Sequence, residues 1–162
     1  QMCIRDRYDA VFEMDCDFSH NPDDLLRLTA ELEAGADVAV GSRYSKGVTV
    51  VNWPMSRLLM SYCASRYVRI VTGMPVCDAT AGFVGYKREV LAAIDFDRIE
   101  MVGYGFQIEM KYTAWKMGFR IGEVPIIFAD RTEGTSKMSG GIFGEAFFGV
   151  LALPFRTIAR KK

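Results

Sequence analysis

Short apolar runs alternate with longer segments of helical period along this chain. The runs at 11–14 and 36–41 have the length and content of buried strands. Between them, leucines recur at helical spacing, at Leu25, Leu28 and Leu32. Two parallel strands need a crossover connection of this kind, which is right-handed in nearly all proteins. The region from Tyr8 to Gly41 therefore predicts a strand, a helix and a strand joined by a parallel crossover.

The rest of the chain continues this alternation of helices and strands. The pattern predicts a long helix at 55–72, a strand at 80–87, a short helix at 89–94, a helix at 105–117 and a last strand at 120–128. The long helix is expected to bury an apolar stripe made of Leu59, Tyr62, Cys63, Tyr67 and Ile70. Repeats and internal linkers are absent from the sequence, so the pattern favours one α/β domain.

Composition agrees with a globular domain and limits the partners. The 162 residues are 50% hydrophobic and 25% charged, which suits one domain with a substantial core. Twenty basic residues balance twenty acidic ones, so no overall field attracts nucleic acid. The most apolar run, at 141–154, is short for a spanning helix and is interrupted by Glu145. It is more typical of a helix that lies on a bilayer or packs in a core.

Two carboxylates, Asp15 and Asp17, follow the first predicted strand one residue apart. Ligands of open α/β sheets bind in the crevice beyond the carboxyl ends of the strands, and both side chains can point there where the chain turns. A pair of carboxylates can hold Mg²⁺ or Mn²⁺, with water and a diphosphate completing the coordination. The alternative is a solvated turn in which Asp17 caps the next helix, and the nearby His20 is expected to pack or cap rather than bind a ligand.

Cationic side chains occur at several other predicted crevice positions. Arg43 ends the second strand, and a guanidinium there can bind phosphate through two hydrogen bonds. Arg57 and Ser61 lie four residues apart on the long helix and so share a face, while Arg131 and Lys137 lie in a glycine-containing loop. Each alone is typical of a solvated surface charge. Their convergence at one crevice is the hypothesis of an anion site.

Five segments, taken in order, resemble the polyprenol-phosphate (dolichol-phosphate) mannose synthases of glycosyltransferase family 2. These segments are MDCDFSHNPDDL, GSRYSKGVTVVNWPMSR, CDATAGFVGYKREVL, GYGFQIEMKYTAWKMGFRIGEVPIIF and DRTEGTSKM. The resemblance implies a GT-A-type, Rossmann-like fold with a mixed, mostly parallel sheet and flanking helices. It also implies transfer of mannose from GDP-mannose to a polyprenyl monophosphate with inversion, dependent on Mg²⁺ or Mn²⁺, at the cytoplasmic face of a membrane.

The resemblance assigns roles to single residues. Asp15 and Asp17 match the metal- and diphosphate-binding DxD motif, and Ser19 stands where some members have a glutamine ligand. The phosphate-binding positions are matched by Arg43, Arg57, Ser61, Arg131 and Lys137, with Arg43 also counted as catalytic together with the two aspartates. Supporting positions are matched by Asp78, Gln107 and Glu109. Asp78 begins the family's D-x-x-S-G-F turn, in which Ala81 replaces the usual serine.

The resemblance also predicts how the chain is organised. It covers 8–138 as the later part of a GT-A domain, with 1–7 as a foreign or disordered terminus and 139–162 as an amphipathic segment at a membrane interface. The strands and helices that hold the nucleoside in this family are expected before Tyr8. We therefore expect the isolated 162-residue chain to be catalytically incompetent.

Three alternatives stay open at this level. Another family 2 enzyme acting on polyprenyl phosphate, for example with UDP-glucose, shares nearly all of these motifs. A haloacid-dehalogenase-like phosphatase also ends an apolar strand in DxD, with the first aspartate as nucleophile. A binding subunit without catalytic activity is the third.

Overall fold

The computed structural model describes residues 7–130 and 140–161 of the chain. The strands are β1 (Ala10–Glu13), β2 (Val38–Ser42), β3 (Val50–Val51), β4 (Val84–Lys87), β5 (Ile121–Pro125) and β6 (Phe128–Ala129). The helices are α2 (Asp24–Glu33), α3 (Met55–Thr72), α4 (Arg88–Ala93), α5 (Tyr104–Lys116) and α6 (Gly140–Ala152), with 3₁₀ turns at Phe96–Arg98 and Leu153–Phe155. The expected alternation of helices and strands is confirmed, with most boundaries shifted by a few residues.

The main sheet has four strands in the order β1, β4, β2, β5. Strand β4 pairs antiparallel with both β1 and β2, whereas β2 and β5 pair parallel. Hence β1, β2 and β5 run in the same direction, and β4 alone is reversed. The expected crossover from β1 through α2 to β2 does join parallel strands, but β4 lies between them. A second, two-stranded parallel sheet pairs β3 with β6.

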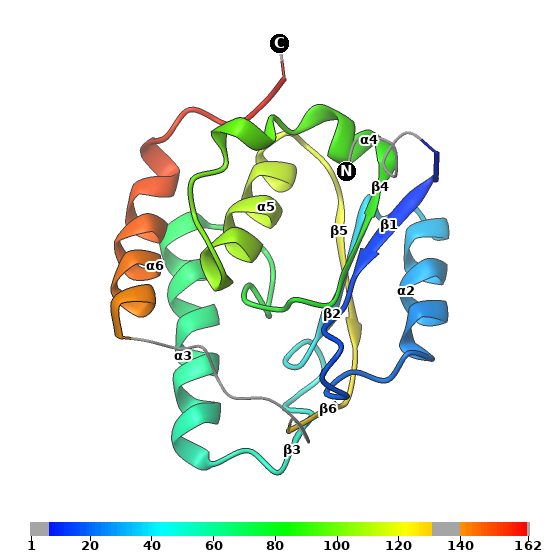
Figure 1. Ribbon diagram of the computed structural model, residues 1–162, viewed down its shortest axis with the longest axis vertical. Helices are drawn as coiled ribbons and strands as arrows, with labels where there is room; N and C mark the ends of the chain where they lie inside the picture. The colour runs from blue at the N-terminus through cyan, green and yellow to red at the C-terminus, as the bar shows by residue number, and fades with distance from the viewer. Residues whose placement is uncertain (1–6, 131–139, 162) are drawn as a thin grey trace.

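Helices cover both faces of the main sheet, because each central strand alternates its side chains between two cores. Ala39 of β2 packs with Leu28 and Leu32 of α2 on one face. Val38 and Val40, its neighbours along the strand, pack with residues of α4 and α5 on the other. Figure 1 shows α2 on one side of the sheet and α3, α5 and α6 on the other. The expected mixed α/β architecture with flanking helices is thereby confirmed.

The long helix α3 has the expected bounds, but its expected apolar stripe is wrong. Leu59 and Ile70 are more than half exposed, whereas the buried side chains of α3 are Ser65, Val68 and Thr72. These three lie three and four residues apart and form one narrow stripe. Val68 packs into a core shared with α5 and the end of α6. The positions of these neighbouring helices, and not the hydrophobicity of α3 itself, therefore decide which face of α3 is buried.

The segment after residue 139 packs on the body of the domain. Val150 and Leu153 are buried against Met101 and Tyr112, and Arg160 forms a β-bridge with Ile94 beyond α4. The opposite side of the segment exposes Phe148 and Phe155. Every helix within residues 7–130 and 140–161 is too short or too polar to span a membrane.

Candidate active site

The acidic pair lies in the turn that follows β1, beyond the carboxyl end of that strand. Asp15 is exposed, and its Oδ2 atom lies so near Gly82 that a Cβ added to this glycine would be 3.8 Å away. Asp17 accepts hydrogen bonds at Oδ1 from the backbone N–H and the hydroxyl of Ser19. Phe18, between Asp17 and Ser19, has a φ of 61°, which is rare for a residue with a side chain. The turn therefore has a specific conformation, fixed in part by Ser19.

His20 anchors this turn to the core. Its ring is buried and contacts Phe83 and Phe128, with ring centroids 5.0 and 4.9 Å apart. Burial lowers the pKa of His20, while the carboxylates of Asp15 and Asp17 oppose this shift. A neutral, packed histidine is the outcome, in agreement with the sequence prediction. The charge of Arg43 also acts on His20 and favours its neutral form. His20 therefore lies close enough to both the acidic pair and Arg43 to feel their charges.

Arg43 forms a buried ion pair with Asp78, whose side chain is 0% exposed. Its Nε and one terminal nitrogen donate to the two carboxylate oxygens at 2.7 and 2.6 Å, and its backbone N–H donates to the same group at 2.9 Å. The terminal nitrogen also donates to Thr80 at 2.9 Å. Aromatic rings surround the guanidinium, namely Tyr44, Trp53 and Phe128. Burial alone would lower the pKa of Arg43, but Asp78 raises it, so the arginine stays charged.

This geometry changes the expected role of Arg43. The sequence predicts that two guanidinium N–H groups of Arg43 bind phosphate. In the structure they donate to Asp78 instead, because the side chain of Arg43 points toward the core. Its phosphate role is untested and stays a prediction. At the end of β2, Asp78 accepts two hydrogen bonds from the guanidinium of Arg43 and a third from its backbone N–H, and so orients the side chain.

Arg57 and Ser61 also have partners within the domain. Arg57 stacks on Trp53 at 4.0 Å from the ring centroid and pairs with Asp130 at 2.6 Å. Both charged side chains are about one-third exposed. Ser61 accepts a hydrogen bond of 2.8 Å from the hydroxyl of Tyr44. The two predicted phosphate ligands on α3 are thus tied to the ends of β2 and β6.

Contacts link all of these groups around one edge of the sheet. The backbone N–H of Ala129 donates to the carbonyl of Ser19, which joins the acidic turn to the segment carrying Asp130. On the other side, Asp15 lies against Gly82, four residues after Asp78. The structure therefore brings together Asp15, Asp17, Ser19, Arg43, Arg57, Ser61 and Asp78. Arg131 and Lys137 lie outside the described residues.

Two charged residues of this region were missed from the sequence. Lys111 of α5 is 0% exposed, and its Nζ donates to the carbonyls of Ala79, Ala81 and Gln107. Glu123 of β5 accepts from the backbone N–H groups of residues 77 and 78. One signal was available, because charged and polar residues recur around α5 without one polar face, which is unusual for a surface helix.

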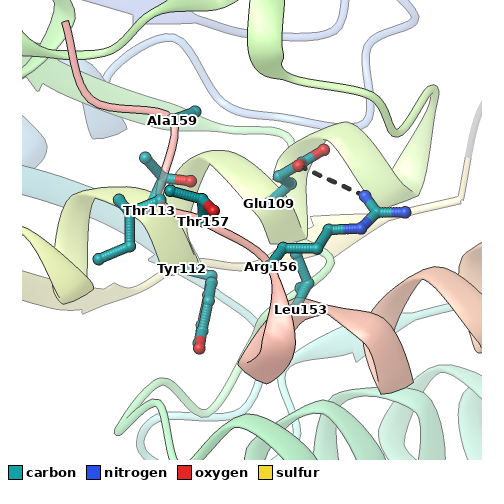
Figure 2. Close-up of a pocket in the computed structure, with 8 residues that line it drawn as sticks. Glu109, Tyr112, Thr113, Leu153, Arg156, Thr157 and Ala159 are labelled. Atoms are coloured by element: carbon teal, nitrogen blue, oxygen red, sulfur yellow. Dashed lines mark ion pairs between the residues drawn. The ribbon is translucent and has the colours of Figure 1, made fainter. Parts of the chain in front are cut away.

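Gln107 and Glu109, to which the resemblance assigns a supporting role, are buried residues of α5. Glu109 accepts hydrogen bonds from the backbone of Glu100 and Met101 and lies 3.8 Å from Arg156. Figure 2 shows this ion pair in a small hollow between α5 and the segment after α6. Gln107 is buried, and its side-chain oxygen has no hydrogen-bond partner among the described residues. Among the described residues, no hydrogen bond or ion pair links either side chain to the acidic turn, and their supporting role stays a prediction.

The acidic turn suits a hard divalent cation with few protein ligands. Asp15 and Asp17 offer carboxylate oxygens, which Mg²⁺ and Mn²⁺ prefer. No group of three or more His, Cys, Asp or Glu side chains gathers at a potential metal site in the described ranges. A site of two carboxylates is still a fit, because Mg²⁺ is usually bound by one or two carboxylates together with water and substrate phosphates.

Comparison with known proteins identifies the family. The sequence profile described as Glycosyl transferase family 2 matches residues 7–95, more than half of the chain. The chain belongs to glycosyltransferase family 2. This membership excludes the haloacid-dehalogenase-like alternative.

The names of similar proteins agree with the resemblance seen in the sequence. A polyprenol monophosphomannose synthase of Mycolicibacterium smegmatis is 47% identical over 147 residues, which are 91% of this chain and 56% of the relative. An undecaprenyl-phosphate mannosyltransferase of Micrococcus luteus is 48% identical over 143 residues, 88% of this chain and 58% of the relative. A dolichol-phosphate mannosyltransferase of Pyrococcus furiosus is 34% identical over 134 residues, covering 82% and 37%. The chain spans little more than half the length of the two bacterial relatives.

Solved structures support the fold. Glucosyl-3-phosphoglycerate synthase from Mycobacterium tuberculosis, in a complex with Mn²⁺, UDP-glucose and glycerol 3-phosphate, matches with a TM-score of 0.59 at 18% identity, over 90% of this chain and 48% of that one. A crystal structure of a mycobacterial protein matches with a TM-score of 0.60 at 17% identity, over 91% and 45%. At these identities the likeness concerns the fold alone.

Proposed function

We propose that this chain is part of an enzyme that transfers mannose from GDP-mannose to a polyprenyl monophosphate, with inversion at the sugar. The observation that carries the proposal is the identity of 47 and 48% to two bacterial relatives named as mannosyl-transferring enzymes of polyprenyl phosphates. The geometry supports it, because acidic and basic side chains meet at the carboxyl edge of the sheet. That edge is where open α/β sheets bind their ligands.

The reaction needs charge neutralisation more than acid–base chemistry. An oxygen of the polyprenyl phosphate attacks C1 of the mannosyl group from the face opposite the diphosphate. The new C1–O bond forms while the bond from C1 to the diphosphate breaks, and GDP leaves with that electron pair. A phosphate monoester is already ionised near neutral pH, so it needs no strong general base. The protein must instead hold two anionic groups that repel each other.

The site residues divide this work. Asp15 and Asp17 would hold a divalent cation, which neutralises charge on the leaving diphosphate when it is bound. Arg57 can exchange Asp130 for a phosphate, because their pair is partly solvated and such pairs contribute little stability. Arg43 adds a guanidinium whose orientation Asp78 fixes and whose charge Asp78 balances. Together they place cationic groups where two phosphates must approach each other.

Exposed apolar side chains on α3, on α6 and on the 3₁₀ turn that follows α6 suit attachment to the membrane that holds a polyprenyl acceptor. Ile70, Phe148 and Phe155 are 77, 69 and 91% exposed. The two helices are neighbours, and the ring of Tyr67 stacks on that of Phe147. Amphipathic helices of this kind bury apolar side chains in the membrane interface. We propose that this surface binds the cytoplasmic face of the membrane.

The test is a transfer assay with the protein expressed from its natural reading frame. Labelled GDP-mannose or UDP-glucose is incubated with a polyprenyl phosphate and Mg²⁺ or Mn²⁺. The proposal predicts label in the lipid fraction from GDP-mannose only, as a mannosyl phosphate whose anomeric configuration is opposite to that of the donor by NMR.

Other outcomes separate the alternatives. Transfer from UDP-glucose but not from GDP-mannose indicates a different family 2 enzyme. Metal-dependent binding of nucleotide without transfer, unchanged by Asp15→Ala, indicates a binding subunit. A product with retained configuration contradicts the direct displacement.

A further inference from the structure

Lys111 is the charged side chain that the proposed reaction leaves unexplained. It lies in the middle of α5, 0% exposed, with no carboxylate within ion-pair distance among the described residues. Transfer of an ammonium group into a protein interior is strongly unfavourable unless its hydrogen bonds to water are replaced. A methionine would fill a similar volume without that cost. The presence of a lysine therefore calls for a specific partner.

The partner is a turn of the backbone. The Nζ atom donates to the carbonyl of Ala81 at 2.7 Å, of Ala79 at 3.1 Å and of Gln107 at 3.2 Å. An ammonium group has three protons, so these three acceptors satisfy it. Two of the carbonyls belong to the turn between Asp78 and β4 and lie on either side of Thr80. Lys111 thus fastens this turn to α5.

The same turn touches both halves of the proposed site. Asp78 at its start holds the guanidinium of Arg43, and Thr80 accepts a further hydrogen bond from it. Gly82 at its end lies beside the carboxylate of Asp15. A displacement of the turn would therefore move Arg43 and the surroundings of Asp15 together.

We propose that Lys111 is a positioning residue for the transfer reaction, which acts through the turn at 78–82 and not through contact with substrate. This inference rests on the proposed function. It adds to the proposed site a residue of α5 that keeps Arg43 and Asp15 in fixed positions relative to each other. The charges near the ammonium support the assignment, since Asp78, Glu13 and Glu123 attract it and Arg43 repels it.

The experiment compares Lys111→Met with Lys111→Arg and with Lys116→Met. Methionine removes the donors and keeps much of the volume, while arginine keeps the charge and several donors. Lys116 lies on the same helix but is exposed and stacks on Trp115, so it serves as the matched control. Two quantities are measured: amide hydrogen exchange of the 162-residue chain, and kcat and KM of the natural protein.

For Lys111→Met we expect faster amide exchange at residues 78–83, with exchange in α2 and α3 unchanged. We also expect kcat to fall about 10- to 100-fold, as for a reacting group displaced by about 1 Å, while KM for the donor changes little. Lys111→Arg should recover part of the lost kcat. Lys116→Met should match the wild type in both measurements.

Two results would overturn the proposal. Unchanged exchange at 78–83 in Lys111→Met shows that the lysine does not hold the turn, whether or not the protein transfers mannose. Faster exchange with unchanged kcat shows that the turn does not position the site. An absence of transfer from the wild type, in contrast, contradicts the proposed function, and the exchange measurement still decides whether Lys111 holds the turn.

Discussion

Two ion pairs of the same length lie near the carboxyl edge of the sheet, in opposite surroundings. Arg43 and Asp78 approach to 2.6 Å with side chains 9 and 0% exposed, while Arg57 and Asp130 approach to 2.6 Å with side chains 32 and 35% exposed. Three hydrogen bonds link the first pair, including one from the arginine backbone. In the second, a terminal nitrogen of Arg57 donates one hydrogen bond to Asp130.

The difference indicates what each arginine can do. Loss of one partner from a buried pair leaves an uncompensated charge in the interior, so separating Arg43 from Asp78 is costly. A partly exposed pair is screened by water and can change partners at small cost. We therefore propose that the buried pair shapes the site, whereas the exposed pair supplies a cation that can turn to a phosphate.

The largest expected effect on stability is at Asp78. Asp78→Asn keeps the size of the side chain but leaves the Arg43 charge unpaired. We expect the free energy of unfolding to fall by about 3–5 kcal/mol, measured by urea denaturation of the 162-residue chain. A loss below about 1 kcal/mol, typical of exposed pairs, would contradict the distinction between the two pairs.

The second prediction concerns pH and Lys111. Burial lowers the pKa of Lys111 to about 7, and the attraction of Asp78 opposes this shift without cancelling it. Between pH 7 and the ordinary lysine value of about 10.5, the unfolded chain binds a proton that the folded chain does not. Stability should therefore rise with pH across this window relative to Lys111→Met. Parallel pH profiles of unfolding for wild type and Lys111→Met would contradict it.

The smallest expected effect on stability is at Asp130. Asp130→Asn removes the partner of Arg57 but leaves a guanidinium that water and Trp53 can accommodate. We expect the free energy of unfolding to change by about 0–1 kcal/mol, and less at high salt. A loss as large as that for Asp78→Asn would show that both pairs are structural.

The fold could be predicted from the sequence where local pattern decides it. The strand content of 36–41 and the limits of α3 follow from apolar runs and from breakers such as Gly73, which has a positive φ of 72°. The insertion of β4 between β1 and β2 does not follow, because strand order depends on contacts between distant segments. The exposed faces of α3 were also mispredicted, since the packing of α6 decides them.

The site could be predicted in its acidic part and less well in its basic part. Asp15 and Asp17 lie at the end of a strand, as their position in the sequence indicates. The sequence could not show that Arg43 points inward to Asp78, 35 residues later, because a strand end does not fix the direction of a long side chain. Nor could it show that Lys111 binds carbonyls, since backbone acceptors leave no pattern in the sequence.

The central claim is tested most directly by the activity of Asp15→Asn in the natural protein, with Asp9→Asn as control. Asp9 is also an aspartate beside β1, but its side chain is 99% exposed and pairs only loosely with Arg88, at 3.7 Å. We predict that transfer of mannose to polyprenyl phosphate falls about 100-fold or more in Asp15→Asn and is unchanged in Asp9→Asn. Equal activity of the two variants would contradict a site organised around the acidic turn.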